Sequence, residues 1–138
     1  MKIEYQVCSL ELAKKLKELG VKQESLFWWF ESKDKKETLL CFDAKLPNEY
    51  IYDFEKNYSA YTCSELGEML PDAVASYRYR TEPDEDPNIW ACIKYVEGEH
   101  SKYDWVCHAP TEADARAKML IYLLENKFLT LPQEKGKG

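Results

Sequence analysis

The stretch 90–127 limits the fold more than any other part of this 138-residue chain. Residues 89–96 are rich in β-branched and aromatic types and show no helical stripe, which is typical of a strand. A short polar run around Gly98 suits a turn, and Pro110 has no N–H to donate, so a return strand ends there. On that return strand, alternation predicts one drier face, made by Tyr103, Trp105, Cys107 and Ala109.

A helix is expected directly after this hairpin. Thr111 is a good N-cap, and Asp114 follows three residues later, where the partner of a capping box would be. Apolar residues then recur with helical spacing, at Ala113, Ala117, Leu120, Ile121, Leu124 and Phe128. We expect this final helix to cover the apolar side of the hairpin.

The upstream sequence repeats these signals in shorter elements. Thr62 and Glu65 form a Thr-x-x-Glu capping box, and Gly20 suits the end of a helix. Residues 43–57 are interpreted as a connection. The predicted helices span residues 10–19 and 63–70, and the predicted strands span residues 1–7, 25–31, 38–42, 58–61 and 73–81.

Strands that come in antiparallel runs, without alternating β-α-β units, favour an α+β fold. We predict one antiparallel sheet of about five strands, packed by two longer helices and one short helix. Residues 1–131 are expected to form a single domain, because the chain is long enough for one core. Residues 132–138 are predicted to be a flexible polar tail.

The chain is acidic, with a formal net charge of −6. This charge disfavours non-specific binding to nucleic acid, which requires Lys and Arg to neutralise phosphates, but it is compatible with a local basic patch. No apolar run has the length of a membrane span, and the start lacks a signal-peptide pattern, so a cytoplasmic location is expected. The cysteines are therefore predicted to be reduced thiols: Cys8, Cys41, Cys63, Cys92 and Cys107.

No pattern typical of a catalytic or metal site is present. Zinc ligands usually come as closely spaced pairs, and no such Cys or His pair occurs. The glycines form neither a phosphate-binding loop nor a dinucleotide fingerprint. Cys92 and His108 from neighbouring strands could form a catalytic pair, but a buried thiol beside a half-exposed imidazole is the simpler interpretation. We therefore predict no catalytic residue, metal site or cofactor.

Candidate partner-binding residues come from aromatic strands and from one acidic turn. Trp28 and Trp29 point to opposite faces of a strand, which indicates either a strand covered on both sides or a face kept for a partner. Tyr77 and Tyr79 share a face, and together with Arg78 and Arg80 they could stack on bases, but the net negative charge and the neighbouring acidic turn stand against this interpretation. The acidic turn could bind calcium or a basic partner, or be a solvated loop. It contains Asp84, Glu85 and Asp86.

Three separated segments, about a third of the chain, resemble a recurring pattern in small phage and prophage proteins. They are SLELAKKLKELGVKQES at 9–25, YTCSELGEMLP at 61–71 and TEADARAKMLIYLLEN at 111–126. The third segment also resembles the closing helix of the phage α-β-α sandwich domain. The resemblance implies an accessory protein of a mobile element, working in the cytoplasm of a bacterial host cell, and it implies no catalytic residues.

The predicted function is that of a non-enzymatic phage or prophage accessory protein that binds another protein or a second copy of itself. Two alternatives stay open. One is a small enzyme with a site around Cys92 and His108, and the other is an acidic inhibitor of a host nucleic-acid-binding protein. Binding to nucleic acid or to a membrane is not expected.

Overall fold

The computed structural model of the chain describes residues 2–42, 51–71, 73–74, 77–96, 98 and 103–131. Its helices and strands confirm the α+β class. None of the described helices is long and apolar enough to cross a membrane. The elements, in chain order, are η1 (Ile3–Tyr5), α1 (Leu10–Glu18), β1 (Phe27–Ser32), β2 (Thr38–Phe42), β3 (Tyr52–Ser59), α2 (Cys63–Met69), β4 (Ala73–Val74), β5 (Tyr77–Pro83), β6 (Trp90–Val96), β7 (Tyr103–Ala109) and α3 (Glu112–Glu125).

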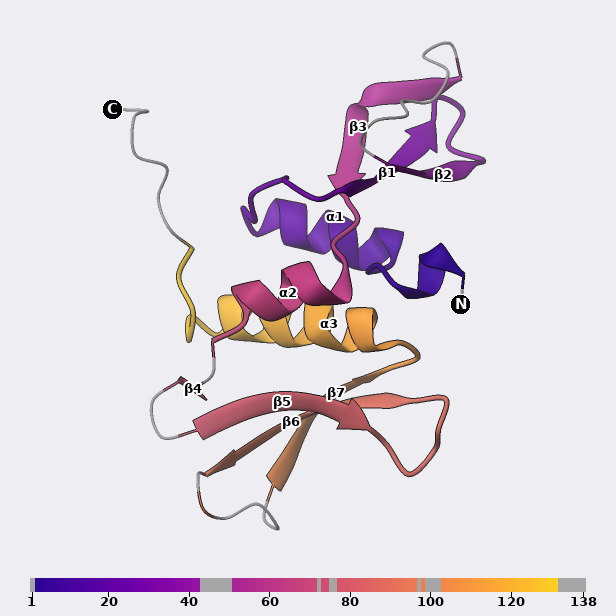
Figure 1. Cartoon of the computed structure of the whole chain (residues 1–138). Helices are drawn as coiled ribbons and strands as arrows, with labels where there is room; N and C mark the ends of the chain where they lie inside the picture. The colour runs from indigo at the N-terminus through magenta and orange to yellow at the C-terminus, as the bar shows by residue number, and fades with distance from the viewer. Residues whose placement is uncertain are drawn as a thin grey trace, which may run out of the picture.

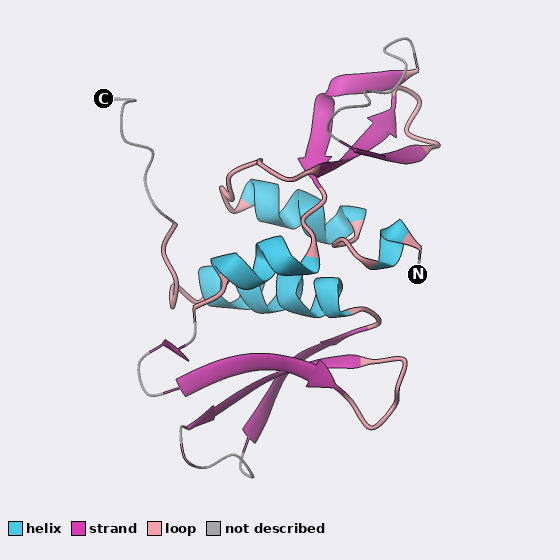
Figure 2. Cartoon of the chain, in the orientation of Figure 1, coloured by secondary structure: helices cyan, strands magenta, loops and turns pink. Residues whose placement is uncertain are grey.

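The strands form two antiparallel sheets with a layer of helices between them (Figures 1 and 2). The N-terminal sheet has the order β2-β1-β3, and the C-terminal sheet has the order β4-β5-β6-β7. The prediction of a single sheet was therefore wrong. The reason is the position of α2, which starts at the Thr62 capping box and ends before Pro71. Because α2 joins the helical layer, the chain leaves β3 on one side of that layer and begins β5 on the other.

The N-terminal sheet contains a strand where the sequence predicted a connection. β3 pairs antiparallel with β1 through residues 57–59 and again at Tyr52, with an irregularity in register between them. Its sequence, YDFEKNYS, is mostly polar and has no strict alternation, so no strand pattern stood out. The earlier part of the predicted connection, residues 43–50, lies outside the described residues.

Most other element boundaries agree closely with the prediction. Residues 2–7 differ, because they form the short turn η1 and an isolated bridge from Val7 to Thr62 in place of a strand. The strand predicted at 73–81 is divided into β4 and β5, which pair with each other. The tail predicted at 132–138 lies outside the described residues.

The end of α1 matches its sequence signal, whereas the start does not. Gly20 takes the left-handed conformation with φ of 88°, and the N–H of Val21 donates to the carbonyl of Leu16 over 3.0 Å. This closure satisfies a carbonyl that the helix end leaves without a partner. Ser9 has the extended backbone of an N-cap, but its side chain makes no capping hydrogen bond.

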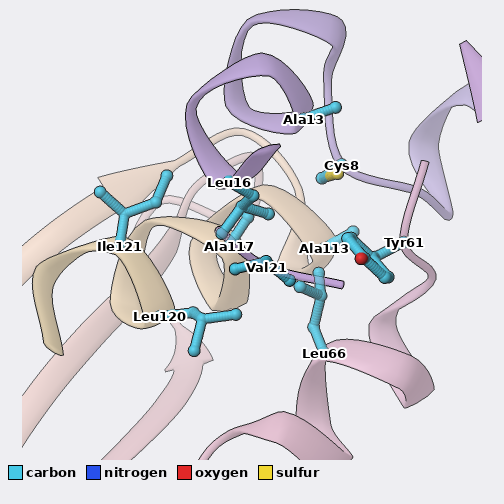
Figure 3. Close-up of a cluster of buried hydrophobic side chains, with 10 residues drawn as sticks. All are labelled: Cys8, Ala13, Leu16, Val21, Tyr61, Leu66, Ala113, Ala117, Leu120 and Ile121. Atoms are coloured by element: carbon cyan, nitrogen blue, oxygen red, sulfur yellow. The ribbon is translucent and has the colours of Figure 1, made fainter. Parts of the chain in front are cut away.

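The helix α3 is the structural centre, because it is buried on two sides. One side joins a cluster with α1 and α2 (Figure 3), through Ala113, Ala117, Leu120 and Ile121. The other side packs on the C-terminal sheet, through Ala115, Met119 and Leu123. The final helix therefore covers the hairpin as expected, but it does so with these three residues and not with the predicted stripe, which faces α1 and α2.

A β-bulge in β7 overturns the prediction of one drier face on that strand. Ile93 pairs with Trp105, but the next residue, Cys92, pairs with Cys107, so Val106 is left over. In an unbroken ladder Cys92 would oppose Val106. The extra residue turns the second half of β7 over, so Tyr103 and Trp105 lie on one face and Cys107 and Ala109 lie on the other.

Two of the cysteines contradict the prediction of reduced thiols. Cys92 and Cys107 lie opposite each other, with 5.0 Å between their Cα atoms, and the structure joins them in a disulfide. The Sγ of Cys92 also lies 2.9 Å from the carbonyl oxygen of Ala115. A disulfide sulfur has no proton to donate, so this contact is a hydrogen bond only when the pair is reduced. Cys8, Cys41 and Cys63 are free thiols.

Candidate functional site

A cleft of about 910 Å³ opens where the starts of three helices meet. Concave sites of this size, with a few converging polar groups, are where ligands and peptide segments usually bind. Its walls come from the segment before α1, the first residues of α2 and α3, and the turn after β5. It is lined by Glu4, Tyr5, Gln6, Ser9, Leu10, Trp29, Thr62, Cys63, Ser64, Pro87, Asn88, Trp90, Pro110, Thr111, Glu112, Ala113 and Asp114.

Aromatic side chains form the apolar part of the cleft. Trp29 reaches in from β1, and its indole Nε1 donates to the carbonyl of Cys8 over 2.9 Å, which fixes the ring. Trp90 lines the cleft from the start of β6, and Tyr5 of η1 is 57% exposed. These rings give the cleft surfaces on which an aliphatic chain or a cation can rest.

The helix starts at the cleft are fixed by caps that the sequence predicts. Thr62 Oγ1 accepts the N–H of Glu65 over 3.2 Å, and Glu65 Oε1 accepts the N–H of Thr62 over 2.8 Å. Thr111 Oγ1 accepts the N–H of Asp114 over 3.1 Å. Asp114 does not complete a second capping box, because its carboxylate accepts the N–H of Ser9 over 2.7 Å. This bond ties the starts of α1 and α3 together.

Three carboxylates belong to the lining of the cleft, and none of the lining residues is Lys, Arg or His. Glu4 is exposed on η1. Burial raises the pKa of the Asp114 carboxyl, and its bond to Ser9 and the attraction of Lys118 offset that rise only in part. With Glu112 as the third acid, the lining favours a cationic group over an anionic one.

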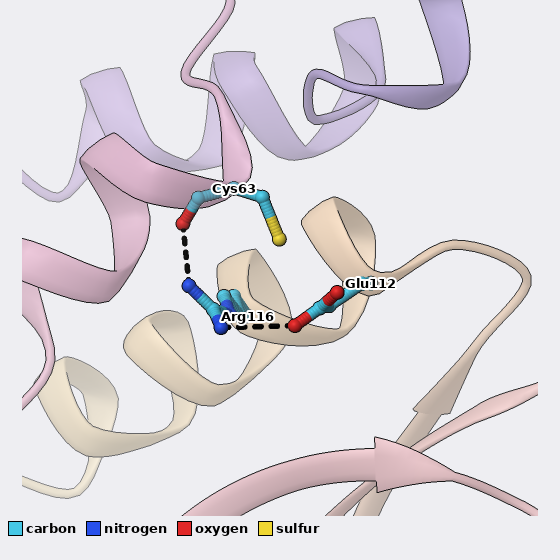
Figure 4. Close-up of polar contacts among 3 residues, drawn as sticks. All are labelled: Cys63, Glu112 and Arg116. Carbon is cyan, nitrogen blue, oxygen red and sulfur yellow. Dashed lines mark hydrogen bonds and ion pairs between the residues drawn. The ribbon is translucent and has the colours of Figure 1, made fainter. Parts of the chain in front are cut away.

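Arg116 lies behind the cleft and holds α2 to α3 (Figure 4). Its Nη1 donates to the carbonyl of Cys63 over 2.7 Å, and its Nη2 pairs with Glu112 Oε1 at 2.9 Å. Gly67 provides the room for this arrangement, because a Cβ there would collide with the guanidinium. Since Arg116 neutralises Glu112 locally, Glu4 and Asp114 supply most of the negative charge of the cleft.

The thiol in the cleft is not an activated nucleophile. Burial raises the pKa of Cys63 to about 11, and the attraction of Arg116 opposes that rise. Burial likewise raises the pKa of Cys8 to about 12. The thiolate is the reactive form of cysteine, so both side chains are almost wholly protonated at neutral pH.

The structure does not bring Cys92 and His108 together into a catalytic site. Cys92 is fully buried beneath α3, in the disulfide with Cys107. His108 pairs with Ala91 and therefore faces the other side of the sheet, where its ring stacks on Trp105 with 4.7 Å between ring centres. Within the described residues, no group of three Cys, His, Asp or Glu side chains is placed to hold a metal ion.

The aromatic candidates from the sequence do not form one surface. Trp29 lines the cleft, whereas Trp28 is half-buried on the opposite face of β1. Tyr79 packs into the cluster beneath α3. Tyr77 is 39% exposed, and Lys94 Nζ lies 5.1 Å from the centre of its ring. Of these four aromatic residues, the structure places Trp29 in the cleft.

The acidic turn lies beside the cleft. Asp84 Oδ1 accepts the N–H of Glu85 over 2.8 Å, and Asp86 Oδ1 accepts the N–H of Asn88 over 2.9 Å, so both aspartates hold the turn in shape. Glu85 is exposed, and the end of the turn, Pro87 and Asn88, lines the cleft. The turn therefore adds negative charge to the rim.

The sequence did not identify the cleft. It marks Glu112 and Asp114 as charges at a helix start and Trp90 as a strand residue. The acidic residues at the helix caps were the available signal, because capping patterns in a sequence show where helices begin. The meeting of three helix starts depends on contacts between segments far apart in the sequence, such as the bond from Ser9 to Asp114.

Comparison of the chain with protein-family models, with curated protein sequences and with solved structures found no match. The function proposed below therefore rests on the geometry of the cleft.

Proposed function

We propose that this chain is a non-enzymatic phage or prophage accessory protein that binds a basic segment of a partner protein in the cleft. The observation behind the proposal is the lining, which combines aromatic rings with carboxylates and includes no basic side chain. A Lys or Arg of the partner would lay its stem on Trp29 or Trp90 and point its charge toward Glu4 and Asp114. The resemblance of three segments to phage and prophage proteins supports the proposed origin.

The helix starts around the cleft do not reverse this preference for a cation. The N-termini of α1, α2 and α3 meet at the cleft, and each carries about half a positive charge, which by itself would attract an anion. Glu112 and Asp114 lie in the first turn of α3, and Glu4 is a further acidic residue of the lining. Even with Glu112 neutralised by Arg116, Glu4 and Asp114 supply about two negative charges against about one and a half positive charges from the three helix starts, so negative potential prevails.

The acidic turn would act at longer range. Exposed charges are felt over a Debye length of about 10 Å at 0.1 M salt, so the turn would steer a basic segment toward the adjoining cleft. Such steering raises the association rate more than the affinity. A host nucleic-acid-binding protein is one class of partner with exposed basic segments, and an acidic inhibitor of such a protein would use the same surface.

The test is capture of a Lys- and Arg-rich peptide, followed by tryptophan fluorescence and by calorimetry. Glu4→Lys combined with Glu85→Lys reverses two exposed charges at the cleft and its rim. We expect this double variant to lose binding at moderate salt. Glu18→Lys combined with Glu68→Lys makes the same change in net charge at exposed positions outside the lining, and we expect it to retain most of the affinity.

Equal loss of binding in the two double variants would mean that net charge alone attracts the peptide, and the cleft would then have no special role. Unchanged binding in both would remove the proposal. A hydrolysed or covalently modified peptide would favour the enzyme alternative.

A further inference from the structure

The sulfur of Cys92 has two partners within reach and can bond to only one of them at a time. It pairs with Cys107 across the ladder of β6 and β7, and it also lies 2.9 Å from the carbonyl oxygen of Ala115 on α3. The disulfide leaves Cys92 without a proton, whereas the thiol has a proton to donate to that oxygen. Oxidation therefore exchanges a hydrogen bond between the sheet and α3 for a covalent bond between two strands.

The Ala115 carbonyl belongs to the first turn of α3 and is well placed to pass on this exchange. A carbonyl oxygen has two lone pairs, so it can accept a thiol proton in addition to the N–H of its own helix. The preceding residue, Asp114, accepts the N–H of Ser9 over 2.7 Å. The bond from Cys92 to Ala115 thus lies one residue away from the contact that joins the starts of α1 and α3.

The two sulfurs differ in their access to solvent. Cys92 is fully buried, whereas Cys107 is half-buried on β7, which is the last strand of the described C-terminal sheet. The bulge at Val106 adjoins Cys107 and interrupts the ladder there. Local opening of this interrupted edge exposes Cys107 without unfolding the core, so a small thiol reaches its Sγ before it reaches that of Cys92.

We propose that Cys92 and Cys107 form a reversible redox switch that responds to a small thiol–disulfide couple such as glutathione. In reduction, a glutathione thiolate attacks the Sγ of Cys107 and breaks the sulfur–sulfur bond. Cys92 leaves as a thiolate, takes up a proton and donates a hydrogen bond to Ala115. A second glutathione thiolate attacks the glutathione sulfur of the mixed disulfide and releases Cys107, which is protonated in turn. The protein gains two electrons and two protons, and two glutathione molecules become one glutathione disulfide.

The first test follows the thiols of the folded full chain in glutathione buffers of graded redox ratio. Free thiols are trapped by alkylation and located by mass spectrometry. We expect Cys92 and Cys107 to become alkylated together as the share of reduced glutathione rises, while the far-UV circular dichroism is retained. Cys41→Ala, which removes a buried free thiol from the N-terminal sheet, leaves this transition unchanged.

The second test separates the hydrogen bond to Ala115 from simple loss of the disulfide. In ¹⁵N-edited NMR spectra, the amide signal of Ser9 reports its bond to Asp114, and we expect its position to differ between the oxidised and reduced chains. Cys107→Ala keeps the Cys92 thiol and gives the reduced position without reductant. Cys92→Ser, whose hydroxyl can still donate, stays close to that position. Cys92→Ala has neither donor nor disulfide, and it gives a third position that is independent of redox conditions.

Three results would overturn the proposal. The first is a disulfide that reduced glutathione leaves intact in the folded chain, as it does with structural disulfides. The second is a Ser9 amide signal at the same position in both redox states. The third is the same Ser9 position in Cys107→Ala and Cys92→Ala, which would mean that the Cys92 thiol donates nothing to Ala115. The redox step does not depend on what the cleft binds, so its failure leaves the proposed function intact.

Discussion

Because α3 is buried on two sides, a cavity on either side should weaken the whole fold. Leu120 is fully buried against α1 and α2, and Met119, 1% exposed, packs toward the C-terminal sheet. Leu120→Ala and Met119→Ala each remove a buried side chain and leave a cavity. Such a substitution typically lowers the free energy of unfolding by about 2–5 kcal/mol. A domain of this size has roughly 5–15 kcal/mol of stability in total, so either loss is large.

The matched control lies on the same helix. Glu125 is exposed at the end of α3, and its carboxylate lies 3.8 Å from Lys15 Nζ, with both side chains more than 40% exposed. Exposed ion pairs of this kind contribute from almost nothing to about 1 kcal/mol, so Glu125→Ala should change stability by much less than either core substitution.

Urea unfolding followed by tryptophan fluorescence and by far-UV circular dichroism provides the assay. Trp28 and Trp29 report on the N-terminal sheet, and Trp90 and Trp105 report on the C-terminal sheet. We expect one coincident transition, shifted by both core substitutions. Separate transitions, with Leu120→Ala moving one and Met119→Ala moving the other, would refute the view that α3 joins the layers into one cooperative unit.

Three further predictions concern the helix caps, a buried carboxyl and the thiols. Thr62→Ala breaks the capping box and lowers the free energy of unfolding by about 1 kcal/mol, whereas Ser9→Ala costs less, because that side chain makes no capping bond; equal losses in urea unfolding would contradict this. Burial raises the pKa of Asp114 above its ordinary 3.8, so the folded state holds this proton more tightly than the unfolded state. The contribution to stability is therefore lost as pH rises from about 3.8 through the raised pKa. Asp114→Asn should remove this loss in unfolding experiments over a pH series. Without reductant, the unfolded chain should react with three equivalents of a thiol reagent, and five equivalents would refute the disulfide; the three are Cys8, Cys41 and Cys63.

Local chemistry made several elements predictable from the sequence. The hydroxyl of Thr62 and the carboxylate of Glu65 form the expected capping box, and Gly20 ends α1 with positive φ. The apolar stripe of the final helix was also visible in the sequence, and in the structure its residues Ala113, Ala117, Leu120 and Ile121 pack against α1 and α2. Each of these signals lies within a few residues of the structure that it specifies.

Features set by contacts between distant segments were not predictable in this way. The division into two sheets depends on β3 pairing with β1 and not with the later strands. The Cys92–Cys107 pair and the outward turn of Trp105 both follow from the extra residue Val106, because it shifts the register of β7 by one. An alternating sequence pattern assumes an unbroken ladder and cannot show where a bulge falls.

The cleft is the central claim, and the most direct measurement is a ¹⁵N-edited NMR titration of the full chain with the Lys- and Arg-rich peptide. We predict that the shifted amides belong to the lining residues within segments 4–10, 62–64, 88–90 and 111–114. Glu4→Lys with Glu85→Lys should abolish these shifts. Shifts that scatter over the surface, or that group on β5 and β7 away from the cleft, would contradict the account.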